Sequence, residues 1–418
     1  MITKDALLQI IHEQQDIKYD KIVPRKIEKN LLLAPEVLVI TGVRRCGKST
    51  LLRQIQQQRE EKDFYINFDD ERLLNFTVED FQTLNEIFYT EFGEQHTYYF
   101  DEIQNIKGWE RFVDRLYTTG NKVFVTGSNA NLLSRELGTL LTGRHVTHEL
   151  YPFSFAEFME YRGYTYSQRD MHTTVGRTRL NSYFMEYLTN GGFPQYLNNG
   201  AAAFLKSLYT DIVFRDVIVR NKISSETALR EMIYYLASNV THPFTYSSIA
   251  KNIGIKSMDT VSGWISCLEQ TYLIHSLNKY DHKVGVQLRS PKKLYFIDNA
   301  LAGQVGFNLG KNRRLWLENA VAIELQRRGA ECYYHNNGSE CDFVVREGGK
   351  VSQVLQVTTA IDDEQTRKRE IAGLIAAMDA YEIENGTIVT LDTNETIDVT
   401  PHRHIRALPC WQWMLENE

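Results

Sequence analysis

A glycine-rich segment followed by lysine and serine is the feature of this sequence that points most directly to chemistry. The pattern G-x-x-x-x-G-K-[ST] is met by Gly42, Val43, Arg44, Arg45, Cys46, Gly47, Lys48 and Ser49, with Thr50 directly after it. Glycines let backbone N–H groups curl around a phosphate, while Lys48 would contact the β- and γ-phosphates and Ser49 would bind Mg²⁺. We therefore expect these nine residues to bind ATP, with Lys48 also acting in catalysis.

Two adjacent acids follow a later apolar segment, Tyr98–Phe100. In a phosphate-binding protein of this type Asp101 would hold Mg²⁺ together with Ser49, and Glu102 would polarise the attacking water. Neighbouring carboxylates fit ATP hydrolysis better than ATP binding alone. The alternative is a solvated strand end without a catalytic role.

A polar pair, Ser128 and Asn129, ends the next apolar segment, which begins at Lys122. A polar residue at this place could touch the γ-phosphate or orient the water, so we take Asn129 as a further catalytic candidate. The same pair is also a common helix N-cap, which is the alternative interpretation.

These candidates need a sheet that brings them together. Short apolar runs bounded by glycine and acids alternate with helical segments over residues 37–128, which is typical of buried parallel strands. We predict an α/β fold with the parallel sheet of a P-loop NTPase over residues 1–160, including a helical lead-in. A helical region over 161–225, a winged-helix domain over 226–300 and a small α/β module over 301–418 follow.

The bulk composition limits the class of protein. At 418 residues with 43% hydrophobic and 24% charged residues, the chain is long enough for two or three globular domains. Its net charge of −6 means that DNA binding would need local basic patches. The five cysteines are scattered without CxxC spacing, and no apolar run is long enough to span a bilayer. We expect a cytoplasmic protein without a membrane segment.

At this point the residues resemble the AAA+ superfamily: the P-loop, the Phe-Asp-Glu strand end, and Ser128-Asn129 in the sensor-1 position. More narrowly, the chain resembles the AAA_14 ATPases that carry a C-terminal DUF4143 region. The shared segments, in order, are GVRRCGKSTLL, DEIQ, GSNANLLS, LTGR followed by ELYPFSFAEF, GGFP, KLYFIDNALA, LENAVAIEL and ECDFVV. The resemblance implies an ATPase domain, a winged helix and a degenerate nuclease-like tail.

In proteins of this kind a neighbouring subunit often supplies an arginine to the γ-phosphate. The resemblance therefore implies a homo-oligomer, for which a hexamer is one candidate. Arg144, in a Thr-Gly-Arg turn, is our first choice for this arginine, and Arg135 and Arg215 are the alternatives.

The middle of the chain reads as a helix-turn-helix. Its predicted core residues are Ile249, Ile253, Val261, Ile265 and Leu268, and its predicted exposed residues are Lys251, Lys256, Ser257, Thr260 and Ser262. Small polar and basic side chains suit contacts with DNA phosphates and base edges. Protein contacts or an inert lid are the alternatives, because recognition helices are normally richer in Arg and Lys.

The tail resembles the PD-(D/E)xK nuclease fold, with Glu318 on a helix and Asp342 on a strand. Such a nuclease needs two carboxylates for Mg²⁺ and a lysine to position water. Gln356 and Thr358 stand where the second acid and the lysine are expected, and Glu340 is a substitute ligand at best. We therefore expect an inactive module that is kept for binding or assembly.

Together these features predict an oligomeric, Mg²⁺-dependent ATPase of the AAA+ type that binds or remodels DNA. Two rival hypotheses remain. The first is a slow nucleotide-driven signalling switch, which low turnover unaffected by DNA would favour. The second is an ATP-gated nuclease, which requires cleavage by the tail despite Gln356 and Thr358.

Overall fold

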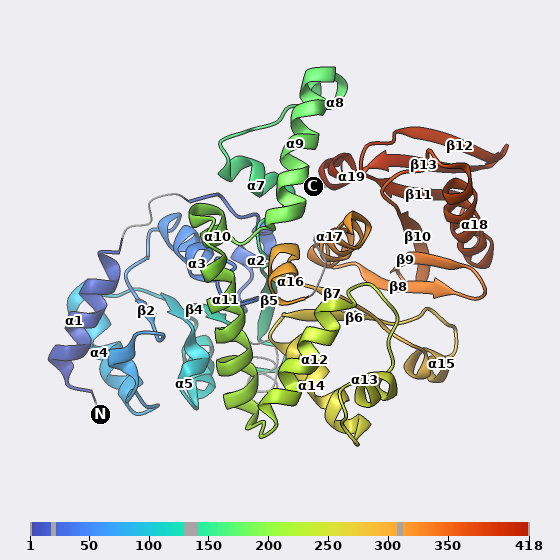
Figure 1. Ribbon diagram of the computed structural model, residues 1–418. Coiled ribbons are helices and arrows are strands. Elements are labelled where there is room, and N and C mark those ends of the chain that lie inside the picture. Colours follow the sequence, from blue (N-terminus) through green and yellow to red (C-terminus); the bar gives the residue numbers. More distant parts are fainter. Residues whose placement is uncertain (1, 18–21, 129–140, 307–311, 417–418) are drawn as a thin grey trace. The chain divides into compact units, whose positions relative to one another are not determined.

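The computed structural model describes residues 2–17, 22–128, 141–306 and 312–416 of the chain (Figure 1). These residues form two compact units, Met1–Tyr151 and Pro152–Glu418. The predicted first boundary at residue 160 lies nine residues beyond the division between the units. Among the described residues, no helix is both long and apolar enough to cross a lipid bilayer.

The first unit is built on a five-stranded sheet with the strand order β2-β3-β4-β1-β5. All four neighbouring pairs run parallel. The strands are β1 (Val37–Thr41), β2 (Tyr65–Asn67), β3 (Thr97–Asp101), β4 (Lys122–Gly127) and β5 (His145–Glu149). The parallel arrangement places the carboxyl ends of β1, β3 and β4 at one edge, where Gly42, Glu102 and Ser128 follow.

Two helices precede β1, and further helices and short 3-10 turns lie between the strands. They are α1 (Lys4–Gln15), α2 (Lys29–Leu33), α3 (Lys48–Gln57), η1 (Glu71–Leu73), α4 (Asp80–Phe92), η2 (Ile103–Asn105) and α5 (Trp109–Thr118). Helix α3 contacts β1, β3 and β4, whereas α5 contacts β4. The N-terminus of α3 therefore lies at the sheet edge that carries the predicted site.

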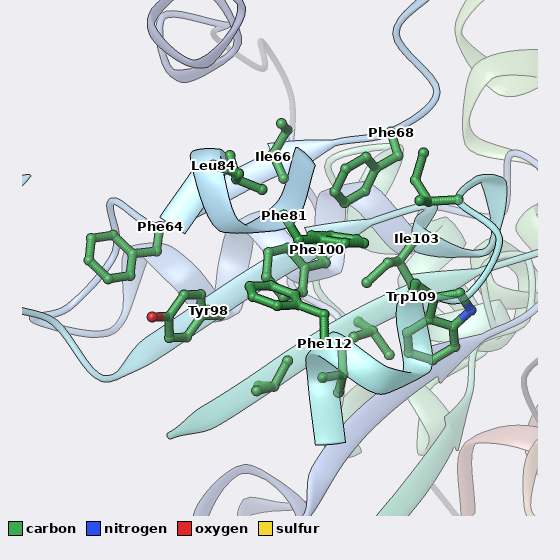
Figure 2. Close-up of a cluster of buried hydrophobic side chains, with 14 of the residues drawn as sticks. Phe64, Ile66, Phe68, Phe81, Leu84, Tyr98, Phe100, Ile103, Trp109 and Phe112 are labelled. Atoms are coloured by element: carbon green, nitrogen blue, oxygen red, sulfur yellow. The ribbon is translucent and has the colours of Figure 1, made fainter. Parts of the chain in front are cut away.

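The core of this unit is an aromatic cluster on one face of the sheet (Figure 2). Side chains alternate between the faces of a strand, so Tyr98 and Phe100 enter the cluster while Tyr99 and Asp101 point to the other face. Phe81 of α4 stacks on Phe112 of α5 with ring centroids 4.4 Å apart, and both rings lie near Phe100. This packing fixes β3 and with it the position of Asp101.

The second unit begins with helices. They are α7 (Phe155–Tyr161), α8 (Gln168–His172), α9 (Thr174–Asn190), α10 (Pro194–Asn199), α11 (Ala202–Asp211), the π-helix η3 (Ile212–Val219), α12 (Glu226–Ser238), α13 (Tyr246–Asn252) and α14 (Met258–Gln270). The turn between α9 and α10 is closed by Asp298, whose carboxylate accepts a hydrogen bond from the Gly192 N–H at 2.7 Å.

Two strands, β6 (Ile274–Leu277) and β7 (Lys293–Phe296), form an antiparallel pair after α14. The short helices α15 (Val284–Arg289) and α16 (Asn299–Val305) lie between them and after them. The winged-helix identity of residues 226–300 stays a prediction.

A six-stranded mixed sheet closes the chain, with the order β12-β13-β11-β10-β9-β8. Its strands are β8 (Glu331–Asn336), β9 (Glu340–Glu347), β10 (Lys350–Val357), β11 (Asn385–Thr390), β12 (Glu395–Thr400) and β13 (Arg403–Pro409). The accompanying helices are α17 (Arg313–Arg327), α18 (Glu364–Tyr381) and α19 (Cys410–Glu416). The α/β class, with a parallel sheet followed by a separate mixed sheet, is confirmed.

Candidate functional site

The glycine-rich loop lies where the sequence places it, between β1 and the first residue of α3. Gly42 has a φ of +146°, and a Cβ atom there would lie 2.1 Å from the Leu150 carbonyl oxygen. The Cys46 thiol donates to the same oxygen at 3.3 Å. The loop is thus held against the residue that follows β5, and a side chain at position 42 would displace it.

Arg25, which lies outside the glycine-rich loop, donates hydrogen bonds that hold the loop in place. Its guanidinium donates to the Cys46 carbonyl at 3.0 Å and to the Tyr151 carbonyl at 2.6 Å. The backbone N–H of Arg25 also donates to the Gln54 side chain on α3. No motif marks this residue in the sequence, and its place in a basic stretch before α2 is the only signal that could have drawn attention to it.

The Lys48 side chain is 3% exposed and turns back into the loop. Its ammonium donates to the Gly42 and Val43 carbonyls, both at 3.2 Å, and lies 3.4 Å from the Glu102 carboxylate. Burial lowers the pKa of Lys48, but the charges of Glu102, Cys46 and Asp101 together outweigh burial, so the pKa lies above its ordinary value. Lys48 is therefore a fixed positive charge at the mouth of the loop.

Asp101 ends β3 on the face opposite the aromatic core, with its side chain fully buried. Its carboxylate accepts hydrogen bonds from the Thr126 hydroxyl at 2.5 Å and the Tyr65 hydroxyl at 3.3 Å. Burial and the neighbouring Glu102 charge raise the pKa of Asp101. A cation beside this carboxylate would favour its charged form.

Glu102 has a φ of +50°, a strained value for a residue other than glycine. Its N–H donates to the Thr126 hydroxyl at 2.9 Å, and the Gln104 amide donates to its carboxylate at 2.5 Å. Burial raises the pKa of Glu102, but the Lys48 charge and the Gln104 hydrogen bond outweigh burial, and the pKa lies below its ordinary value. Glu102 is therefore an ionised base held between an ammonium and an amide.

Ser128 follows β4 at the same edge of the sheet. Its hydroxyl is buried and has no hydrogen-bond partner among the described residues. Because an unpaired buried hydroxyl is costly, the group is suited to a ligand that supplies an acceptor. Asn129, the predicted catalytic residue beside it, lies outside the described residues.

The structure places Arg144 away from its own loop. The Arg144 carbonyl accepts from the Val37 N–H at the amino end of β1, whereas the loop follows the carboxyl end of that strand. Its guanidinium pairs with Asp114 at 2.6 Å and remains 44% exposed. Of the alternative arginines, Arg135 lies outside the described residues and Arg215 is exposed on η3 of the second unit.

The structure also brings the predicted tail residues together. Glu318 of α17, Glu340 and Asp342 of β9 all contact the ammonium of Lys293, a residue that the sequence interpretation did not select. Gln356 of β10 lies next to Asp342. Within the described ranges, no group of three or more His, Cys, Asp or Glu side chains is arranged to hold a metal ion.

Two family models match parts of the chain. A family model described as "AAA domain", AAA_14, matches residues 34–159, and a model described as "Domain of unknown function (DUF8612)" matches residues 181–313. The first match covers the loop, Asp101, Glu102 and Arg144. The predicted DUF4143 region stays a prediction.

Two relatives match most of the chain. The uncharacterized protein MJ1544 of Methanocaldococcus jannaschii is 31% identical over 438 residues, covering 99% of this chain and 96% of the relative. An uncharacterized protein of Haemophilus influenzae is 32% identical over 342 residues, covering 78% of this chain and 82% of the relative. The solved structure of Cdc6p from Pyrobaculum aerophilum shares 12% identity, covers 77% of this chain and 99% of that one, and has a TM-score of 0.26, too low to transfer any property.

Proposed function

The chain belongs to the AAA_14 family of AAA+ P-loop ATPases, and from this premise we propose that Gly42–Thr50, Asp101 and Glu102 carry its reaction. The observation that carries the proposal is the buried Lys48 ammonium, which lies inside the loop and 3.4 Å from the carboxylate of Glu102. A cation and a base in one buried pocket are the two groups that phosphoryl transfer to water requires.

The loop fits a triphosphate. The Lys48 ammonium already lies against the loop carbonyls, and the buried Ser128 hydroxyl, which has no partner among the described residues, needs an acceptor. Phosphate oxygens of ATP would replace the Gly42 and Val43 carbonyls as acceptors for Lys48. Mg²⁺, held by Ser49 and Asp101, would neutralise charge on the phosphates when bound.

Glu102 is the proposed general base. It takes a proton from water as the water oxygen bonds to the γ-phosphorus and the bond from phosphorus to the β–γ bridging oxygen breaks, giving ADP and phosphate. Thr126 positions both carboxylates, because its hydroxyl accepts from the Glu102 N–H and donates to Asp101.

The direct test of the loop is Lys48→Ala, with exposed Lys107→Ala as the matched control. Removing the ammonium that reaches the loop carbonyls and Glu102 should abolish both turnover and ATP affinity. Steady-state phosphate release and calorimetry would measure the two. Unchanged turnover in Lys48→Ala would overturn the assignment of the loop.

We also propose a homo-oligomer in which Arg144 of one subunit reaches the ATP of its neighbour. The support is geometric: Arg144 lies at the amino edge of the sheet and the loop follows the carboxyl edge, so the arginine cannot serve its own site. Its pairing with Asp114 is exposed and weak enough to exchange for a phosphate.

Subunit mixing tests this arrangement. Arg144→Ala and Lys48→Ala should each be inactive, and an equimolar mixture should regain about one quarter of wild-type turnover, because that fraction of head-to-tail interfaces joins two intact residues. Wild-type turnover of Arg144→Ala alone would exclude this residue and turn attention to Arg215.

Finally, we propose that the α13–α14 segment binds DNA. In support, Ile249, Val261, Ile265 and Leu268 are buried, Ile253 is partly buried, and Lys251 and Lys256 are exposed beside the N-terminus of α14. Gel shifts over a salt series should show affinity that falls with salt, and the slope should decrease by about 2 in Lys251→Ala/Lys256→Ala. An affinity for DNA that does not change with salt concentration would rule out DNA binding by this surface.

A further inference from the structure

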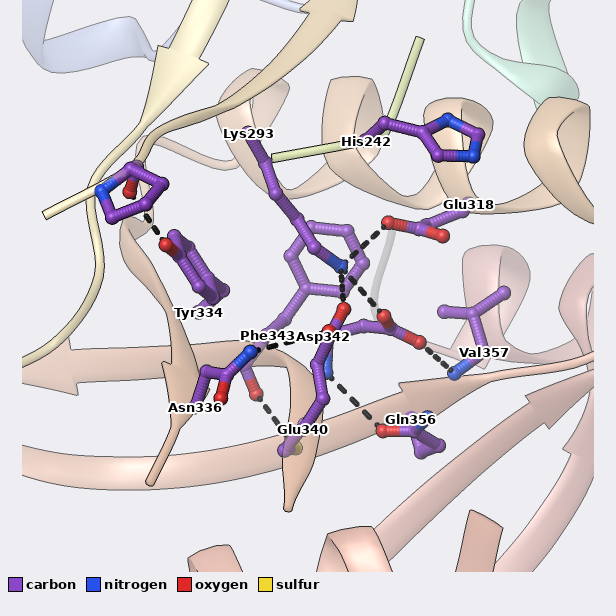
Figure 3. Close-up of polar contacts among 12 residues, drawn as sticks. His242, Lys293, Glu318, Tyr334, Asn336, Glu340, Asp342, Phe343, Gln356 and Val357 are labelled. Carbon is purple, nitrogen blue, oxygen red and sulfur yellow. Dashed lines mark hydrogen bonds and ion pairs between the residues drawn. The ribbon is translucent and has the colours of Figure 1, made fainter. Parts of the chain in front are cut away.

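A lysine lies at the centre of a carboxylate cluster in the second unit (Figure 3). The Lys293 ammonium is 2.7 Å from Glu340 Oε1, 2.9 Å from Asp342 Oδ1 and 3.1 Å from Glu318 Oε1. The lysine comes from β7, one glutamate from α17, and the other two acids from β9. Three oxygens from two elements thus converge on a nitrogen contributed by a third.

The carboxylates are held in this orientation by further hydrogen bonds. The second carboxylate oxygen of Asp342 accepts a hydrogen bond from the Val357 N–H at 3.0 Å. The backbone N–H of Asp342 donates to the Gln356 side-chain oxygen at 3.2 Å. The Tyr295 hydroxyl donates to Glu318 at 3.0 Å. The oxygens therefore point to one place because of the surrounding backbone and side chains, as well as because of the lysine.

The burial of the cluster makes a cation necessary. The side chains of Lys293, Asp342 and Glu318 are 2%, 1% and 4% exposed, whereas Glu340 is 40% exposed. Buried carboxylates without a counter-charge repel each other and lose solvation. Burial and the nearby Asp342 charge raise the pKa of Glu318 to about 7.

Lys293, Glu318 and Glu340 line a cavity of about 610 Å³, together with His242, Arg314, Arg369 and Glu370. An ion can therefore reach Glu318 and Glu340 from this cavity. Oxygen ligands from several carboxylates are what Ca²⁺ and related hard cations prefer, at distances of roughly 2.3–2.6 Å, a few tenths of an ångström shorter than those to the lysine nitrogen.

We propose that the Lys293 ammonium is a resident cation that occupies the place of a divalent metal ion in this cluster. Its three N–H groups match the three carboxylates, so the wild-type protein takes up no metal ion there. The ammonium offsets part of the negative charge of the cluster from within the chain, and the module needs no metal to stay folded. This inference concerns the second unit and does not depend on the proposed roles of the ATPase residues.

The test converts the cluster into a metal site. In the full-length chain, Lys293→Met removes the charge and keeps the side-chain length, and Lys293→Met/Asp342→Asn is the matched control. Tb³⁺ is the probe, because Tyr295 contacts Glu318 and would sensitise its emission. The carboxylates of the P-loop unit are the same in all variants, so their binding cancels in the comparison.

We expect Lys293→Met to bind one additional Tb³⁺ per chain, with an affinity about tenfold or more above that of the double variant. Ca²⁺ should displace this Tb³⁺ and should raise the unfolding midpoint of Lys293→Met, leaving the wild type unchanged. Two results would overturn the proposal: no gain of binding in Lys293→Met, or wild-type binding that Asp342→Asn abolishes, which would indicate a native metal site.

A folding failure remains informative. If Lys293→Met is unfolded in EDTA, it and Lys293→Gln should be refolded by dialysis with and without Ca²⁺ and examined by circular dichroism. Recovery that requires Ca²⁺ supports the proposal, since the ion then replaces the ammonium. Equal recovery under both conditions, or none under either, contradicts it.

Discussion

The Glu102 carboxylate contacts the Lys48 ammonium and the Gln104 amide, and the backbone of Glu102 is strained. When ATP is bound, the Lys48 ammonium would contact the phosphates as well as Glu102. The amide of Gln104 therefore becomes the main group that positions the base while water attacks. The other amide atom, Gln104 Oε1, is buried without a partner among the described residues.

We predict that Gln104→Leu lowers kcat by roughly 10- to 100-fold, the loss expected for one hydrogen bond to a charged group. KM for ATP should change little, because Gln104 does not line the loop. Steady-state kinetics of this variant should be compared with Asn105→Ala, which alters the exposed neighbour on the same turn. An equal fall in kcat for both variants would mean that catalysis depends on the conformation of the turn and not on the Gln104 amide.

Sequence patterns reveal some of these residues and not others. The loop that contains Lys48 and the pair Asp101-Glu102 could be placed from the sequence because each lies at the end of a short apolar strand. Gln104 lies in the shared segment DEIQ but received no role there, and Arg25 lies in a basic stretch that carries no motif. Lys293 was missed because the lysine was sought on β10, whereas it comes from a strand 49 residues before Asp342.

At the scale of elements, the contact between the glycine-rich loop and the end of β5 decides the shape of the site. Gly42 meets the Leu150 carbonyl oxygen, to which the Cys46 thiol also donates. Edge strand β5 was itself not predicted: its side chains are mostly partly buried or exposed, so it lacks the apolar run that marked the other strands.

We predict that Gly42→Ala lowers the free energy of unfolding by clearly more than Gly120→Ala. Both glycines have positive φ, so each substitution adds about 1–3 kcal/mol of backbone strain. Only at position 42 would the new Cβ also collide with backbone, since nothing lies within 4 Å of it at position 120. Urea unfolding measures both variants, and calorimetry should show weakened ATP binding for Gly42→Ala alone. Equal losses in the two variants would contradict the proposed contact.

At the scale of the whole molecule, the order of elements follows the sequence closely, whereas the predicted domain boundaries stay predictions. Apolar periodicity predicted the parallel sheet and the later α/β module. The units divide at Tyr151, at the start of the segment YPFSFAEF, which is mostly apolar and resembles the core on both sides. A domain boundary depends on which contacts form across it, and a single sequence does not contain that information.

Stability of the chain should fall between about pH 4.5 and pH 7. Glu318 has a pKa of about 7 in the folded protein against an ordinary value of 4.5, so the folded state binds a proton that the unfolded state has lost. The contribution is full below pH 4.5 and is lost as the pH rises through 7, up to about 3 kcal/mol. Glu318→Gln, which keeps the acceptor for Tyr295 and Lys293, should flatten this part of the unfolding curve. An unchanged slope would refute this role of Glu318.

The central claim is that Lys48 and the loop bind ATP while Glu102 activates the water, and one variant separates the two roles. For Glu102→Gln, calorimetry with MgATP should give an affinity close to that of the wild type, because the loop is intact. Phosphate release by the same preparation should fall by about 100-fold or more, as expected for loss of a general base. Turnover near the wild-type rate with ATP still bound would contradict the account.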